Sequence, residues 1–132
     1  MAQVPVRVLL VDDYPDTCRF LSVVLAPELE VVGVAVDGRA AIDAVVRLRP
    51  DIILMDYQMP IMDGLEATAR IKQMPDAPKI VLFTSDDLAD LRRRAFAAGV
   101  DGMLQKGCDF DLLRQTLLDL VVSQTPAERR AA

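Results

Sequence analysis

Five short, near-continuous runs of apolar residues alternate along the chain with longer segments of mixed polarity. The apolar runs lie at residues 6–11, 30–36, 52–55, 79–83 and 100–105. Charged residues, glycine or proline bound each run. Apolar runs of this length and setting are typical of strands that are buried on both faces, as in a parallel sheet. The pattern therefore predicts five strands, the fifth being the weakest.

The segments between these runs carry apolar residues at helical spacing, which predicts a helix after each strand. The expected helices begin at Pro15 and then cover residues 41–48, 65–71, 86–98 and 109–122. Pro15 suits the first turn of a helix, and Gly99 is well placed to end one. Strands that alternate with helices predict an α/β fold: a doubly wound, five-stranded parallel sheet with helices on both faces.

Several helical segments assign particular side chains to the core or to solvent. In the fourth, Leu88, Leu91 and Ala95 are expected to face inward, with Arg92, Arg93 and Arg94 in solvent. Phe20 in the first helix and Phe110 in the fifth belong to the expected apolar faces.

The 132 residues fit one domain, which we expect to span 1–122 with a polar tail at 123–132. We expect a free-standing domain, because the chain ends soon after the fifth helix.

Composition and charge narrow the functional classes. Apolar runs are far shorter than the roughly 20 residues that a membrane span needs, and the first residues lack the features of a signal peptide. Cys18 and Cys108 lack metal-ligand spacing and fit a reduced, cytoplasmic chain. The net charge of −5 argues against nucleic acid as a direct partner. With no histidine, the chain contains no Ser-His-Asp triad, no Cys-His pair and no histidine-bound zinc.

Polar side chains follow four of the predicted strands at the point where each strand ends. They are Asp12 and Asp13, Asp56, Thr84, and Lys106. Ligands of open α/β sheets bind at the carboxyl ends of the strands, and a shared edge lets these side chains converge. Three neighbouring carboxylates repel one another, at about 4 kcal/mol for two charges ~4 Å apart in an effective dielectric near 20. The cluster therefore calls for a raised pKa, a lysine or a divalent cation.

The polar side chains at these strand ends are suited to binding a charged phosphoryl group. Mg²⁺ fits a site that offers carboxylates, a carbonyl and waters. With the metal, Lys106 would neutralise phosphoryl oxygens, and Thr84 would donate a hydrogen bond. Asp56 is then a candidate nucleophile.

Four sequence motifs carry a resemblance to a known family. They are Asp12-Asp13, the run Asp-Tyr-Gln-Met-Pro-Ile-Met-Asp-Gly at 56–64, Thr84-Ser85, and Ala-Gly-Val-Asp-Gly at 98–102 before Lys106. Over residues ~6–122 the chain resembles the CheY-like receiver domain of response regulators in two-component signalling. The resemblance implies a flavodoxin-like strand order, 2-1-3-4-5. It also implies a phosphorelay function, in which a histidine kinase or histidine phosphotransfer protein donates the phosphoryl group.

The same resemblance implies roles for single residues. Asp13, Asp56 and the backbone carbonyl of Gln58 would hold Mg²⁺, and Asp12 would assist through water. Asp56 would be the phosphorylation site and Lys106 would bind the phosphoryl group. Thr84 would be the switch hydroxyl. The output would pass to an unknown protein through the face formed by the fourth helix, fifth strand and fifth helix. On this basis we expect a phosphoryl acceptor with at most self-dephosphorylation, and no enzyme.

Two positions depart from the family pattern. Met103 stands where an aromatic residue usually completes the switch, and Gly107 stands where a proline in a cis bond often follows the lysine. These departures leave open an alternative, a degenerate receiver that acts as a phosphorylation-independent interaction module. A phosphatase of the haloacid dehalogenase type is another interpretation, but such enzymes need a second acid two residues after the nucleophile, where this chain has Gln58. A flavin-binding protein would need a loop rich in hydroxyls and glycine in place of Asp12-Asp13.

Overall fold

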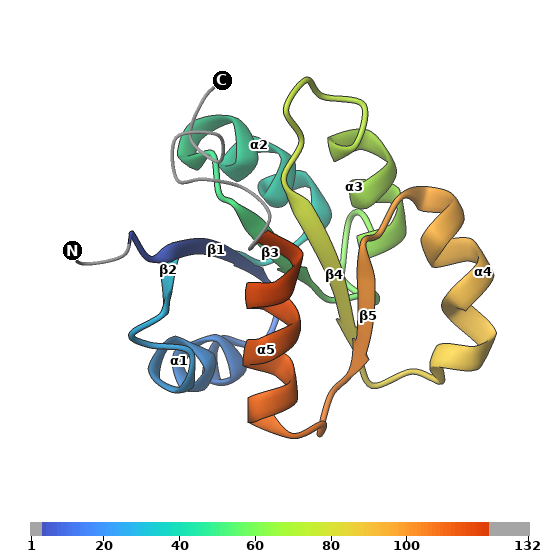
Figure 1. Ribbon diagram of the computed structural model, residues 1–132. Coiled ribbons are helices and arrows are strands. Elements are labelled where there is room, and N and C mark those ends of the chain that lie inside the picture. The colour runs from blue at the N-terminus through green and yellow to red at the C-terminus, as the bar shows by residue number, and fades with distance from the viewer. Residues whose placement is uncertain (1–3, 122–132) are drawn as a thin grey trace.

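Five parallel strands form the centre of the molecule, and helices cover both faces of the sheet (Figure 1). The computed structural model describes residues 4–121. The strands are β1 (Val6–Val11), β2 (Leu29–Ala35), β3 (Ile52–Met55), β4 (Lys79–Thr84) and β5 (Gly102–Gln105). They pair in the order β2-β1-β3-β4-β5, which confirms the predicted topology.

One helix follows each strand among the described residues. The helices are α1 (Pro15–Val24), α2 (Gly38–Leu48), α3 (Gly64–Ile71), α4 (Leu88–Ala98) and α5 (Phe110–Val121). The α/β prediction is confirmed, and β1 and β3 have the predicted bounds. The ends of the other elements are shifted by one to three residues. Residue 122 and the predicted tail at 123–132 lie outside the described residues.

Local capping explains the shift at the start of α4. The helix was predicted from residue 86 but begins at Leu88, because Asp87 is its N-cap and its side chain accepts a hydrogen bond from the N–H of Ala89 (2.9 Å). Asp63 caps α3 in the same way. Gly99 ends α4 with a φ of 112°, as predicted, in the left-handed region that glycine adopts without strain.

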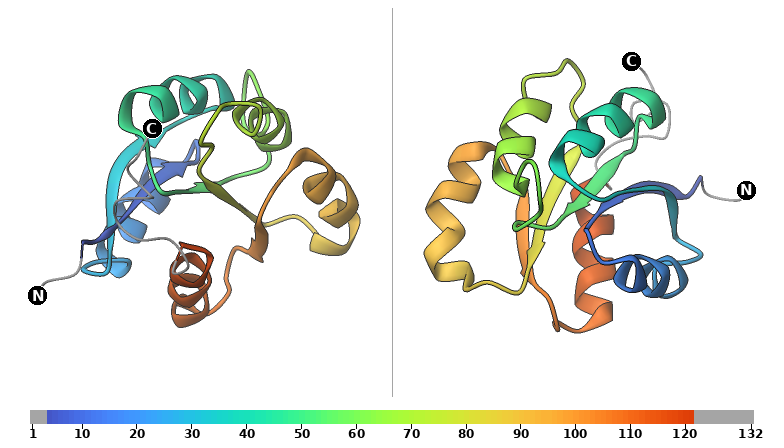
Figure 2. Two further views of the ribbon diagram at one scale, coloured as in Figure 1. Left: turned by 45° about the horizontal axis from the view of Figure 1, so that its top comes forward. Right: turned by 180° about the vertical axis from the view of Figure 1, so that it is seen from behind.

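The core consists of two layers, one on each face of the sheet (Figure 2). One layer packs the sheet against α2, α3 and α4, and the other packs it against α1 and α5. The four residues of β3 show why the apolar runs are continuous: Ile53 and Met55 enter one layer, while Ile52 and Leu54 enter the other. A strand covered on both sides has no solvent-facing position.

Two aromatic residues assigned to the core by helical spacing are half-exposed instead. Phe20 on α1 and Phe110 on α5 are 51% and 43% exposed. Their rings pack edge to face, with centroids 5.2 Å apart. Leu21 and Leu113 fill the core positions beside them. The two rings therefore bridge α1 and α5 at the surface.

Candidate functional site

The carboxylates of Asp12, Asp13 and Asp56 meet at the carboxyl edge of the sheet. Ligand oxygens of the three side chains lie within 4.8 Å of one another. Backbone hydrogen bonds anchor two of them: the N–H of Asp12 donates to the carbonyl of Ala35, and that of Asp56 donates to the carbonyl of Val11, both at 2.9 Å. Because Asp12 and Asp56 directly follow neighbouring strands, the sheet itself fixes their separation.

Lys106 joins the two buried carboxylates from the end of β5. Its Nζ lies 2.8 Å from Asp12 Oδ2 and 3.2 Å from Asp56 Oδ2. The backbone N–H of Lys106 donates to the carbonyl of Thr84 (2.8 Å), which holds the lysine beside β4. Asp12 and Asp56 are buried, while Asp13 is exposed. The structure therefore brings Asp12, Asp13, Asp56 and Lys106 together, as the strand ends predicted.

The electrostatics of the cluster leave an excess of negative charge. Burial raises the pKa of Asp56, although the nearby Lys106 ammonium opposes this. Burial alone would lower the pKa of Lys106, but its hydrogen bonds and ion pairs with Asp12 and Asp56 outweigh that and raise it. Lysine and aspartate side chains are charged near neutral pH. Three carboxylates facing one ammonium then carry a net charge of about −2, which a divalent cation would balance.

Thr84 and Gln58 are connected to each other through Asp86. Thr84 is buried, and its Oγ1 accepts a hydrogen bond from the N–H of Asp86 (3.2 Å). The exposed Gln58 donates from Nε2 to Asp86 Oδ2 (2.7 Å). The sequence placed Thr84 and Gln58 around the same site, but it did not predict that Asp86 forms hydrogen bonds with both of them. Their hydrogen bond ties the loop after β3 to the loop after β4.

A second connection leaves the site through Tyr57, and sequence reasoning missed it. The N–H of Tyr57 donates to Asp56 Oδ1 (2.8 Å). Its hydroxyl accepts a hydrogen bond from Arg94 Nη2 on α4 (3.3 Å), and the Arg94 guanidinium lies 5.7 Å from the centre of the ring. The only signal in the sequence was the position of Tyr57 directly after Asp56.

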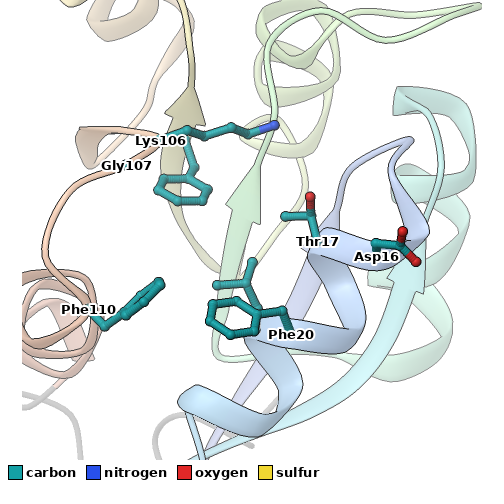
Figure 3. Close-up of a pocket in the computed structure, with 8 residues that line it drawn as sticks. Asp16, Thr17, Phe20, Lys106, Gly107 and Phe110 are labelled. Carbon is teal, nitrogen blue, oxygen red and sulfur yellow. The ribbon is translucent and has the colours of Figure 1, made fainter.

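A pocket of about 380 Å³ opens beside Lys106, between α1 and α5 (Figure 3). Phe20 and Phe110 lie side by side in this view, and Lys106 and Gly107 lie above them. The lining residues are Asp16, Thr17, Phe20, Leu21, Phe83, Lys106, Gly107 and Phe110. The half-exposed aromatic pair thus lies within reach of the polar cluster.

The two departures from the family pattern have clear local settings. Met103 is half-buried and packs against the core layer under α4. Gly107 has a φ of 97°, and a Cβ there would meet no atom within 4 Å. Proline, whose φ is fixed near −65°, cannot adopt that backbone conformation. Glycine therefore matches a loop geometry different from the one that a proline at this position would require.

Comparisons with known proteins agree with this fold. The response regulator receiver domain family matches residues 8–118. A crystal structure of a LuxR-family two-component response regulator from Aurantimonas sp. has 30% sequence identity and a TM-score of 0.84, covering 92% of this chain and 89% of that one. The response regulator domain of Thermotoga maritima CheB has 27% identity and a TM-score of 0.76, with 91% and 96% covered.

This chain belongs to the response regulator receiver domain family of two-component systems. Phosphorylation and Mg²⁺ binding at the acidic pocket are typical of that family, whose members interact with histidine kinases or phosphotransfer proteins. The described residues contain no helix long and apolar enough to cross a membrane.

The similar proteins also correct one expectation. Protein-glutamate methylesterase/protein-glutamine glutaminase 1 of Syntrophus aciditrophicus is 37% identical over 124 residues, which cover 88% of this chain and 35% of that protein. The prediction that the chain is no enzyme is contradicted, because this relative and others are named as enzymes. Their match is confined to the receiver part, and the chain spans about a third of the length of these curated relatives.

Proposed function

We propose that this chain is a phosphoacceptor and that Asp56 takes up the phosphoryl group. The observation that carries the proposal is the position of Asp56: its carboxylate lies at the end of a buried strand, within 4.8 Å of those of Asp12 and Asp13 and with Lys106 Nζ 3.2 Å from Oδ2. Asp13 is exposed, whereas Asp12 and Asp56 are buried, and each of these two accepts a backbone N–H and contacts Lys106. Of the two buried carboxylates, Asp56 is the one that the family resemblance assigns as the phosphorylation site.

In the proposed reaction, a carboxylate oxygen of Asp56 attacks the phosphorus of a phosphohistidine on the donor protein. The new bond is an acyl phosphate O–P bond, and the P–N bond breaks with its electron pair returning to the imidazole nitrogen. Lys106 neutralises charge on the transferring oxygens. Thr84 is the last residue of β4, beside Lys106. Its hydroxyl gives up the hydrogen bond from the N–H of Asp86 and donates one to the phosphoryl group instead.

The donor atoms of the site fit Mg²⁺. Three carboxylates that offer only oxygen ligands within 4.8 Å, with about two negative charges in excess, suit a small divalent cation that keeps several waters. We propose Asp13, Asp56 and the carbonyl of Gln58 as ligands, with Asp12 acting through water. When bound, the ion neutralises charge on the phosphoryl oxygens. Without it, Lys106 is the one cation that the described residues place on this cluster.

The proposed partners follow from the surfaces next to the site. A histidine kinase or phosphotransfer protein would deliver the phosphohistidine beside Lys106, where Phe20 and Phe110 provide exposed apolar area. The output would leave through the face of α4, β5 and α5.

Cys18 and Cys108 are free thiols, as expected of a cytoplasmic protein. The family match to residues 8–118 falls within the proposed receiver bounds of 1–122.

Intact mass spectrometry after incubation with Mg²⁺ and a small phosphodonor tests the assignment. We expect one acid-stable, base-labile phosphoryl adduct, which Asp56→Asn abolishes. Asp63→Asn is a matched control, because Asp63 is a carboxylate of the same loop that caps α3 and lies outside the cluster. An undiminished adduct in Asp56→Asn would refute the site. The absence of any adduct in the parent would favour the degenerate receiver.

A further inference from the structure

Helix α4 concentrates positive charge on a molecule that is acidic as a whole. Arg92, Arg93 and Arg94 are three of the 15 basic residues, while the net charge of the chain is −5. All three side chains are exposed. Among residues 4–121, none of them forms an ion pair with a carboxylate. Arg19 and Arg70, by contrast, are each paired with an acidic residue on their own helix.

The arginines accompany an exposed aromatic ring and small side chains. The Arg92 guanidinium lies 5.4 Å from the centre of the Phe96 ring, which is 44% exposed. Ala89 and Ala97 are exposed on the same helix. The acidic residue of α4, Asp90, lies in its first turn, where the helix dipole favours negative charge. The middle of α4 therefore presents guanidinium groups and one aromatic ring that contacts Arg92. Its small side chains let a partner approach the helix closely.

The position of α4 leaves this surface accessible. The helix lies at the β5 edge of the sheet, at the side of the molecule opposite to α1 (Figures 1 and 2). Leu91 and Ala95 face the core, so the arginines point away from it. Arg and aromatic residues are the types enriched where proteins bind each other, and guanidinium groups pair with carboxylates in bidentate geometry.

We propose that the arginine surface of α4, formed by Arg92, Arg93 and Phe96, docks an acidic protein segment that also carries an apolar side chain. Carboxylates of the segment pair with Arg92 and Arg93, and the apolar side chain packs on Phe96. Charge complementarity selects this partner, because the rest of the molecule repels acidic chains. A nucleic acid also carries negative charge, but the net charge of −5 disfavours it beyond this one helix.

Arg94 connects the arginine surface to Asp56. Its side chain donates a hydrogen bond to the hydroxyl of Tyr57, and the backbone N–H of Tyr57 donates one to Asp56. A phosphoryl group on Asp56 changes the oxygen that Tyr57 contacts, so the two states of the site differ in how they hold Arg94. This regulatory part rests on the proposed phosphorylation of Asp56, whereas the docking part does not. It also provides a path to α4 that bypasses Met103.

Fluorescence anisotropy with a labelled peptide of glutamates interspersed with leucines tests the docking. We expect saturable binding that weakens with salt and is lost when glutamine replaces each glutamate. Arg92→Gln with Arg93→Gln should weaken binding at least about 3-fold, from the strength of exposed ion pairs. Arg39→Gln with Arg47→Gln makes the same change of net charge on exposed residues of α2. That control should bind within about 2-fold of the parent, since exposed charges away from the contact contribute little.

Amide shifts identify the surface, and beryllofluoride with Mg²⁺ tests the regulation. Peptide should shift residues 92–97, and beryllofluoride, a phosphoryl mimic, should change peptide affinity in the parent more than in Tyr57→Phe. Equal weakening by the two double variants, or tighter binding of a single-stranded oligothymidine at residues 92–97, would overturn the acidic-segment proposal. An unchanged affinity with beryllofluoride bound at Asp56 would overturn the regulatory part. A chain that ignores beryllofluoride but binds the peptide through Arg92 and Arg93 would refute the proposed function alone.

Discussion

Gly64 is the position where the smallest change should damage the site most. It is the first residue of α3, and its N–H donates to the carbonyl of Tyr57 (2.7 Å). A Cβ added there would lie 1.9 Å from the backbone oxygen of Asp56 and 3.0 Å from its carbonyl carbon. Backbone atoms cannot rotate away, so Gly64→Ala must move the loop or the helix.

The size of the effect follows from that contact. A normal separation requires α3 and Asp56 to move apart by more than about 1 Å, and overpacking of this kind costs about 1–3 kcal/mol. Better helix propensity of alanine offsets less than about 1 kcal/mol. We therefore expect the free energy of unfolding to fall by about 1–2 kcal/mol. A ~1 Å displacement of the Asp56 backbone should slow phosphorylation about 10- to 100-fold.

Two measurements check this prediction: urea unfolding at equilibrium, and the rate of the phosphoryl adduct by intact mass with a small phosphodonor. Gly102→Ala is the matched control. Its added Cβ would meet Leu120 and Val81 side chains at 3.6 and 3.7 Å, which is ordinary contact. It should leave the adduct rate close to that of the parent. If Gly64→Ala equals the parent in both stability and rate, the contact with Asp56 does not constrain this position.

Three further predictions concern the site. Because burial raises the pKa of Asp56, its ionisation costs stability, which falls as the pH rises from 3.8 through the folded pKa. Asp56→Asn should lack that loss and melt at a higher temperature at pH 7 without Mg²⁺, and an equal or lower melting temperature would contradict this. Gln58→Ala and Asp86→Ala each break their mutual hydrogen bond, so either should change the lifetime of the phosphoryl adduct, about 2- to 10-fold for a bond of ~0.5–1.5 kcal/mol. Mg²⁺ affinity should stay nearly unchanged, and equal lifetimes would refute the idea. Met103 is flexible and discriminates weakly between states. Met103→Tyr should therefore enlarge the amide shifts that beryllofluoride causes at residues 88–91. If the parent already shifts fully at these residues, the weak-coupling idea is wrong.

The linear pattern of the chain was enough for the fold and for the polar cluster. Strands buried on both faces leave continuous apolar runs, and β1 and β3 could be read to the residue. Because parallel strands end at one edge, side chains that follow them must lie near one another. Asp12, Asp56 and Lys106 were predictable as a group for that reason, although they are far apart in sequence.

Contacts between elements were decided only by the tertiary structure. Helical spacing counted Phe20 and Phe110 as core residues, but the core is already filled by Leu21 and Leu113, so the two rings pack edge to face at the surface. Tyr57 and Arg94 are 37 positions apart, and no periodicity relates them. Their contact depends on where α4 packs against the loop after β3. Periodicity reports which face of an element is buried, whereas the choice of partner depends on how whole elements pack.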